Sequence, residues 1–312
     1  MTPGKPTINQ NTGALGRILT IILFIMVFSV QYSTAAEPLN IYVVNYPLKY
    51  FAERIGGDHV KVEFPVPADV DPAYWNPDLA NISAYQKADL ILLNGAGYAK
   101  WVAKVSLPRS KMVDTSRQFK DLYITNKEVM NHSHGAAGEH AHEALAFTTW
   151  LDFELAARQA EVIAAAMGRK RKDLHDTFQR NYKALAEDLK RLDRDIQAIV
   201  SNNPTTPLFV SHPVYDYFTR RYALNIVSVH WEPDQVPRDF QLKDFKGILK
   251  QHPAEWMIWE GQPVQASVDE LKALGVDSLV FDPCGNAPNQ GNFMTVMRRN
   301  VEDFRRVFPI ED

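Results

Sequence analysis

The stretch DLHDTFQRNYKALAEDLKRLDRDIQAIVS, from Asp173 to Ser201, sets the architecture that we expect for the whole chain. Its apolar residues recur at spacings of three and four, which places them on one side of a helix. Neither Gly nor Pro interrupts the stretch, and most other residues in it are charged or polar. At 1.5 Å per residue the helix would span about 40 Å, the width of a domain. We predict a strut joining two lobes; the alternative is an ordinary amphipathic helix on one continuous core. The apolar positions are Leu174, Phe178, Tyr182, Leu185, Leu189, Leu192, Ile196 and Ile199.

Short apolar runs alternate with helical patterns on both sides of this helix. Strands alternating with helices indicate a parallel sheet covered by helices. The expected fold class is therefore α/β, with two lobes, each a mostly parallel sheet wrapped by helices, joined by one long rigid helix. The expected divisions are a signal peptide at 1–36, an N-terminal lobe at 37–168 with a His-rich loop at 131–143, the connecting helix at 169–204, and a C-terminal lobe at 205–312.

The N-terminus has the order of a secretory signal peptide. Lys5 and Arg17 precede the apolar run Ile18–Val30, and small residues lead to Ala36. The run is short for a membrane span, which needs about 20 residues. We expect cleavage near Ala36 and a periplasmic location, with a retained N-terminal anchor as the alternative. The single cysteine, Cys284, excludes an internal disulfide and a Cys-based zinc site.

Composition and motifs exclude several classes of function. The formal net charge of −3, together with the lack of a basic run beside aromatic residues, argues against a nucleic-acid partner. The chain has no Gly-x-Ser-x-Gly, no His-Glu-x-x-His and no Gly-rich phosphate loop. We therefore expect a binding protein and not an enzyme.

Polar side chains follow four of the predicted strands in the second half of the chain. They are His212, His230, Glu260 and Asp282. In open parallel sheets, ligands bind outside the carboxyl ends of the strands. We therefore expect a ligand site that involves some of these four residues.

A second group of histidines lies in the expected N-terminal lobe, in a Gly/Ala-rich segment. We interpret this segment, from Asn126 to Leu145, as a mobile loop. The group is His132, His134, His140 and His142. Neutral imidazole binds zinc, copper and nickel, and small spacers let a loop wrap an ion. We expect an accessory metal-collecting loop; the alternative is a solvated loop with no such role.

Aromatic residues near predicted strand ends suggest a third feature. Trp75 and Trp231, with Thr148, are candidates for the wall of a cleft. An aromatic wall with a few polar groups suits an organic ligand or a chelated metal. The alternative is ordinary core packing.

The chain also resembles a known family over nearly all of its length after the signal peptide. The matching stretches are VDPAY at Val70–Tyr74, KADLILLNG at Lys87–Gly95, WLD at Trp150–Asp152, SHPVYDYF at Ser211–Phe218 and FDP at Phe281–Pro283. Their order around a long helix resembles the periplasmic solute-binding component of zinc/manganese ABC importers of cluster A-I. The resemblance implies two lobes joined by a rigid helix, with a metal ion bound between them.

The resemblance implies three His and one carboxylate as metal ligands, and this sequence departs from that set. His212 and Asp282 fall on two of the positions, whereas Ala73 and Thr148 occupy the other two. Alanine cannot bind a metal, and a neutral hydroxyl is a poor zinc ligand. Replacement ligands could come from His230, Glu232, Asp234, Glu260 or Asp71, or from water. Alternatively, His212 and Asp282 hydrogen-bond one another and hold no metal.

The function expected from the resemblance is capture of a divalent metal, zinc first and manganese or another metal second, and delivery to an ABC permease in the inner membrane. We expect a monomer. Two alternatives remain open: the same scaffold binding an organic ligand or metal chelate in an aromatic cleft, and a metallochaperone or adhesin-like binder without a permease.

Overall fold

The computed structural model describes residues 1–5, 37–126 and 144–309. The chain forms two compact units, Met1–Glu37 and Pro38–Asp312. Most of the expected signal peptide, with its apolar run, lies outside the described residues. Within the described ranges, the helices include none that is long and apolar enough to cross a membrane. The second unit contains the fold.

The first sheet of this unit is parallel and has the strand order β2-β1-β3-β4. We call this sheet and its helices the N-terminal lobe. β1 pairs with β2 on one side and with β3 on the other, and these two central strands, β1 and β3, are the most buried of the sheet. The sequence did not predict β4, whose three residues are all half-buried and carry no alternating pattern. The elements are β1 (Leu39–Val43), α2 (Tyr46–Gly56), β2 (Val60–Glu63), α3 (Leu79–Lys87), β3 (Leu90–Leu93) and β4 (Met112–Asp114).

The second sheet is also parallel, with the order β10-β9-β7-β8, and we call it with its helices the C-terminal lobe. The central strands β7 and β9 are the most buried, as expected for strands covered on both faces. The elements are β7 (Pro207–Val210), α6 (Asp216–Tyr222), β8 (Asn225–Ser228), α7 (Asp239–Gln251), β9 (Trp256–Trp259), α8 (Gln265–Ala273), β10 (Asp277–Val280) and α9 (Phe293–Phe304).

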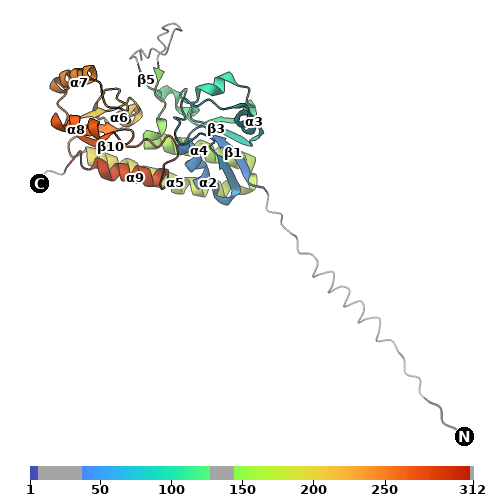
Figure 1. Cartoon of the computed structure of the whole chain (residues 1–312). Helices are drawn as coiled ribbons and strands as arrows, with labels where there is room; N and C mark the ends of the chain where they lie inside the picture. Colours follow the sequence, from blue (N-terminus) through green and yellow to red (C-terminus); the bar gives the residue numbers. More distant parts are fainter. Residues whose placement is uncertain (6–36, 127–143, 310–312) are drawn as a thin grey trace. The chain divides into compact units, whose positions relative to one another are not determined.

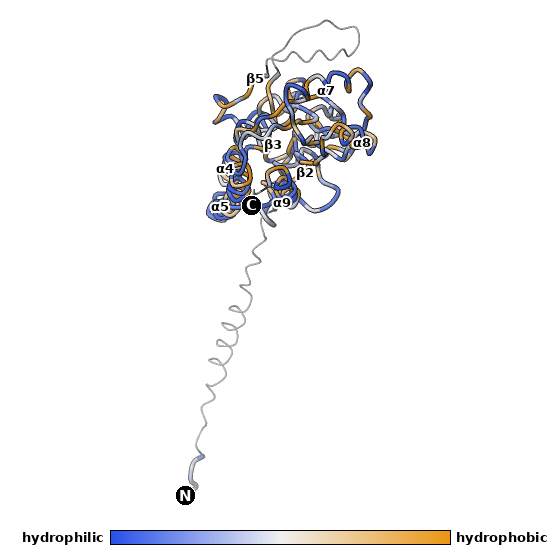
Figure 2. Tube along the Cα trace, turned by 90° about the vertical axis from the view of Figure 1, so that its left-hand side faces the viewer, coloured by the Kyte–Doolittle hydropathy of each residue, from blue (hydrophilic) through white to orange (hydrophobic). Residues whose placement is uncertain are grey.

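The long helix is present as α5 (His175–Val200), preceded by a 3₁₀ turn at Lys172–Leu174. Its predicted apolar stripe is confirmed: Phe178, Leu185 and Leu189 are fully buried. α5 packs against the shorter helix α4 (Phe153–Lys170), and it also contacts α2 of one lobe and α9 of the other (Figure 1). Both helices carry a mixture of hydrophilic and hydrophobic residues, as expected of amphipathic helices (Figure 2).

One hydrophobic core runs through both lobes. It contains Ile41 of the first sheet, Leu208 of the second and Leu189 of α5. A smaller cluster around Phe209 and Trp259 lies within the C-terminal lobe. The α/β class with two helix-wrapped parallel sheets is thus confirmed, and the connecting helix lies on a core that both lobes share.

Short elements complete the described residues. β5 (Thr125–Asn126) pairs antiparallel with β6 (Ala144–Leu145), so the prediction of a loop reaching from Asn126 to Leu145 is wrong at both ends. Two residues on each side form ladder bonds that the sequence pattern does not reveal. The segment between them, with His132, His134, His140 and His142, lies outside the described residues. The 3₁₀ helices not yet named are Gly57–His59, Lys100–Lys104, Arg109–Lys111, Arg117–Leu122 and Thr149–Leu151.

Candidate metal centre

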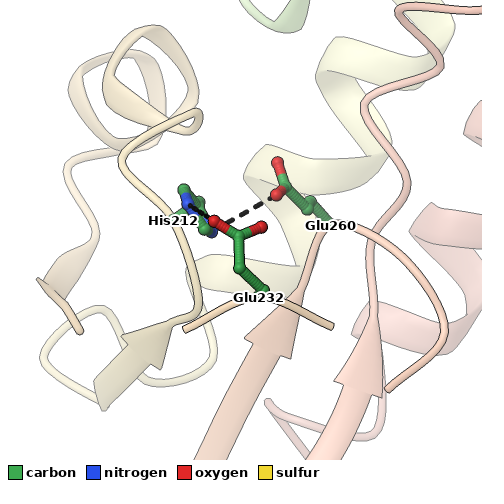
Figure 3. Close-up of side chains that lie close together, drawn as sticks. All are labelled: His212, Glu232 and Glu260. Atoms are coloured by element: carbon green, nitrogen blue, oxygen red, sulfur yellow. Dashed lines mark ion pairs between the residues drawn. The ribbon is translucent and has the colours of Figure 1, made fainter. Parts of the chain in front are cut away.

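Three side chains that could bind a metal converge at the carboxyl edge of the second sheet. His212 follows β7, Glu232 follows β8 and Glu260 follows β9. Because β7 lies between β8 and β9, the three loops leave the sheet side by side. Figure 3 shows the carboxylates of Glu232 and Glu260 both turned toward the His212 ring, with dashed lines marking the two ion pairs. We call these three residues the metal centre.

Both nitrogens of the His212 ring lie near an acidic group. Nε2 is 3.2 Å from Oε1 of Glu232, and Nδ1 is 3.3 Å from Oε1 of Glu260 (Figure 3). Nδ1 also lies 3.2 Å from the carbonyl oxygen of Trp231. The backbone N–H of Glu260 donates to Oγ of Ser211 at 3.4 Å, which ties the β9 loop to the β7 loop. One ligand atom from each of the three residues fits within 4.8 Å of the others.

Exposure differs across the metal centre. The side chains of His212 and Glu260 are 22% and 27% exposed, whereas that of Glu232 is 52% exposed. Burial raises the pKa of Glu260; the charge of His212 opposes this rise, and the charges of Glu232, Asp71 and Asp282 add to it. The centre therefore gathers negative charge that a cation would compensate.

This donor set fits a divalent metal. Zinc is bound by histidine nitrogen and by Asp or Glu oxygen, usually in tetrahedral geometry. His212, Glu232 and Glu260 would supply three such ligands, and a further group would complete the coordination. A pocket of about 200 Å³ opens beside Glu232, bordered also by His230, Arg238 and Phe240.

Two predicted ligands lie beside the metal centre without belonging to it. The ring of His230 is 6.2 Å from that of His212, measured between centroids. Asp282 uses Oδ1 to accept a hydrogen bond from the backbone N–H of Cys284 at 2.7 Å. Burial raises the pKa of Asp282, and this bond and the charge of Arg299 partly offset the rise. In the described part of the chain, the group of residues that could hold a metal includes neither of them.

Ala73 and Thr148, which stand where the family has metal ligands, are both packed into the structure. Ala73 is only 3% exposed. The hydroxyl of Thr148 donates to the carbonyl oxygen of Val214 at 2.5 Å, and so links the two lobes. Trp75 packs edge-on against Trp101.

Trp231 is 3% exposed and packs against Phe245 and Trp259 in the smaller core cluster. Trp231 also borders the pocket beside Glu232, so its role in a cleft wall stays a prediction. From the sequence, Glu232 was predicted only as one of several possible replacement ligands. Its position just after β8, two residues from His230, is the signal that could have marked it as a main candidate.

Two parallel sheets covered by helices around a shared core place the chain in the class of two-lobed α/β proteins. Residues 41–307 match the family described as zinc-uptake complex component A, periplasmic (ZnuA). The chain belongs to this family.

Relatives of known name are distant in sequence. The zinc-binding lipoprotein AdcA of Streptococcus pneumoniae is 25% identical over 296 residues, which cover 91% of this chain and 58% of the relative. The chain thus spans less than two thirds of that protein. The high-affinity zinc uptake system protein ZnuA of Bacillus subtilis is 25% identical over 229 residues, covering 72% of this chain and 71% of the relative.

Solved structures share the fold. The metal-dependent lipoprotein YcdH from Bacillus subtilis superposes with a TM-score of 0.73 at 20% identity, covering 86% of this chain and 98% of its own. A crystal structure of ZnuA gives 0.70 at 23% identity, with coverages of 88% and 100%. Zn(II)-bound AdcA from Streptococcus pneumoniae gives 0.73 at 22%, with coverages of 88% and 59%.

Proposed function

We propose that this chain is the solute-binding protein of a zinc ABC importer and binds the ion at His212, Glu232 and Glu260. The observation that carries the proposal is the convergence of these three side chains in a member of this family. Relatives named for zinc binding or zinc uptake support zinc as the ligand. Manganese or another divalent metal is the second choice.

The metal centre would work by exchanging hydration water for protein ligands. His212 offers one ring nitrogen, while the other keeps a hydrogen-bond partner that orients the ring. Glu232 and Glu260 offer oxygen atoms, and their charge is neutralised by the ion. A site with more carboxylate than imidazole is harder than a three-His site, but zinc still ranks above manganese in intrinsic affinity.

The proposed setting is the periplasm, reached through a cleavable signal peptide at residues 1–36. The partner is an ABC permease in the inner membrane, which would receive the ion from the loaded protein, and the working form is a monomer. The His-rich loop, with His132, His134, His140 and His142, would collect metal and pass it to the centre. Family membership supports the setting and the permease.

Calorimetric titration of the purified protein with Zn²⁺ tests the proposal. We expect one tightly bound ion, with binding weakened at least 100-fold in His212→Ala. His175→Ala, an exposed histidine at the start of α5, is the matched control and should bind as the parent does. A variant lacking His132–His142 separates the loop from the centre. Binding lost only with the loop, or absent from the intact protein, would contradict the proposal.

A second candidate function has one observation in its favour. A pocket of about 570 Å³ lies over β10 between α8 and α9, bordered by Asp282 with Arg299 and Arg306. Its two guanidinium groups suit the carboxylates of an organic chelate. Titration with zinc and then with zinc citrate distinguishes the candidates, because only a chelate-binding protein would prefer the complex.

A further inference from the structure

Ser211 lies where the loops of the metal centre leave the second sheet. It is the residue between β7 and His212, and its side chain is fully buried. A buried polar group costs free energy unless it is hydrogen-bonded, so a buried serine needs a partner for its hydroxyl as well as for its backbone. The backbone N–H, the carbonyl oxygen and the hydroxyl of Ser211 each bind one of the two neighbouring strands or the loop that follows it.

The backbone of Ser211 is bonded on both sides of β7. Its N–H donates to the carbonyl oxygen of Ile258 in β9 at 2.9 Å, and its carbonyl oxygen accepts from the N–H of Trp231, after β8, at 2.7 Å. Trp231 directly precedes Glu232, and its own carbonyl oxygen lies 3.2 Å from Nδ1 of His212. Ser211 therefore fixes the peptide that leads into Glu232 through backbone bonds alone.

The hydroxyl of Ser211 replaces a bond that the sheet would otherwise make between backbone groups. In a parallel ladder, the N–H and the C=O of one residue bind residues two apart on the neighbouring strand. After the bond from Ser211 to Ile258, the next bond would therefore join the N–H of Glu260 to the carbonyl oxygen of Ser211. This N–H donates instead to Oγ of Ser211, at 3.4 Å. The side chain of Ser211 thus holds the peptide that carries Glu260.

The peptide of Glu260 matters because it sets where the carboxylate can reach. Oε1 of Glu260 lies 3.3 Å from Nδ1 of His212, and one ligand atom from each residue of the metal centre lies within 4.8 Å of the others. Moving the peptide would move the Cβ atom and every atom beyond it, and so would pull the carboxylate out of this arrangement. Groups that orient metal ligands in this way contribute to metal affinity without contacting the ion.

We propose that Ser211 is a positioning residue for metal binding, whose hydroxyl holds Glu260 where it can bind the same ion as His212. The inference rests on the proposed function, because it assumes that the three residues of the metal centre hold the ion. The hydroxyl bonds the peptide of Glu260, whereas the loop of Glu232 is held by the carbonyl oxygen of Ser211. The effect of the hydroxyl on the ion therefore passes through Glu260 and not through Glu232.

Two double-mutant cycles test this inference. Zn²⁺ affinity is measured by calorimetry for Ser211→Ala, Glu260→Ala and Glu232→Ala, and for Ser211→Ala combined with each of the other two. Ser211→Ala keeps the backbone bonds and removes only the hydroxyl, and we expect it to bind about 10-fold more weakly. Added to Glu260→Ala, it should cost no further affinity, because the ligand that it positions is gone. Added to Glu232→Ala, it should cost as much as it does in the parent.

A matched control and a rescue separate positioning from a general structural role. Ser116 of the N-terminal lobe is also fully buried, and its Oγ lies 2.5 Å from the hydroxyl oxygen of Tyr123. Ser116→Ala should lower the melting temperature but leave Zn²⁺ affinity unchanged. Ser211→Thr keeps the hydroxyl and adds a buried methyl group, so it should bind more tightly than Ser211→Ala even where the methyl group lowers stability. In the metal-free protein, amide hydrogen exchange at Glu260 should be faster in Ser211→Ala and unchanged in Ser116→Ala.

The outcomes are distinct. An unchanged affinity in Ser211→Ala, or an equal loss in the Glu260→Ala and Glu232→Ala backgrounds, would overturn this inference, while binding that depends on His212 keeps the proposed function. An intact protein that binds no Zn²⁺ would overturn both. If Ser211→Ala does not fold, Ser211→Cys, with a weakly accepting sulfur of similar size, takes its place in both cycles and should show the same pattern.

Discussion

At the scale of single residues, His212 organises the metal centre because acidic groups face both nitrogens of its ring. The sequence could place His212 and Glu260 at strand ends, since strand ends follow from pattern. It could not predict that Glu232 forms an ion pair with His212, because this contact depends on how the loops pack after folding. Asp282 spends one carboxylate oxygen on the N–H of Cys284, whereas Glu232 reaches the imidazole.

Replacing Glu260 by Gln should weaken metal binding and stabilise the metal-free protein. Burial raises the pKa of Glu260 above its ordinary value of 4.5, so the folded protein binds this proton more tightly than the unfolded chain. The free energy of unfolding therefore falls as pH rises from the ordinary pKa to the raised one. Glutamine removes that loss. We expect Glu260→Gln to raise the melting temperature of the metal-free protein by a few degrees at neutral pH, measured by thermal denaturation.

The same substitution should have little electrostatic effect on stability well below pH 4, where glutamate is protonated in both the folded and the unfolded state. Zinc affinity of the parent should fall as pH drops through the raised pKa, because protons compete with the ion for Glu260. A variant that is less stable than the parent at neutral pH would contradict the electrostatic account.

At the scale of elements, the sequence pattern predicted the long helix and the alternation of strands and helices on both sides of it. It missed β4, β5 and β6, which have two or three residues and therefore no periodicity to detect. The regular part of α5 begins at His175 and not Asp173, because a 3₁₀ turn at Lys172–Leu174 connects it to α4. Short elements of this kind depend on contacts that arise only after the chain has folded.

Truncating Leu189 in α5 should destabilise the protein strongly. Leu189 is fully buried in the core that both lobes share, and Leu→Ala at such sites costs about 2–5 kcal/mol. Arg194→Ala on the exposed side of the same helix should change the free energy of unfolding by less than about 0.5 kcal/mol. Urea denaturation measures both, and equal losses would show that the stripe does not carry the stability.

At the scale of the whole molecule, the two sheets rest on one core, so the lobes should unfold together. We expect a single calorimetric transition for the metal-free protein. Zinc at about 100 times its Kd should stabilise the folded state by about 2.7 kcal/mol and shift that transition upward without splitting it. Two transitions, only one of them sensitive to zinc, would show that the lobes are independent.

The three side chains of the metal centre differ in exposure, so an ion would reach and leave the centre from one side. Glu232, the most exposed of the three side chains, borders the open pocket, while His212 and Glu260 lie deeper. An incoming ion would exchange its first water for Glu232 and would part from Glu232 last on its way out. For an ion bound as we propose, the outer carboxylate would then mainly affect the rate of release, and the inner pair would mainly affect the affinity.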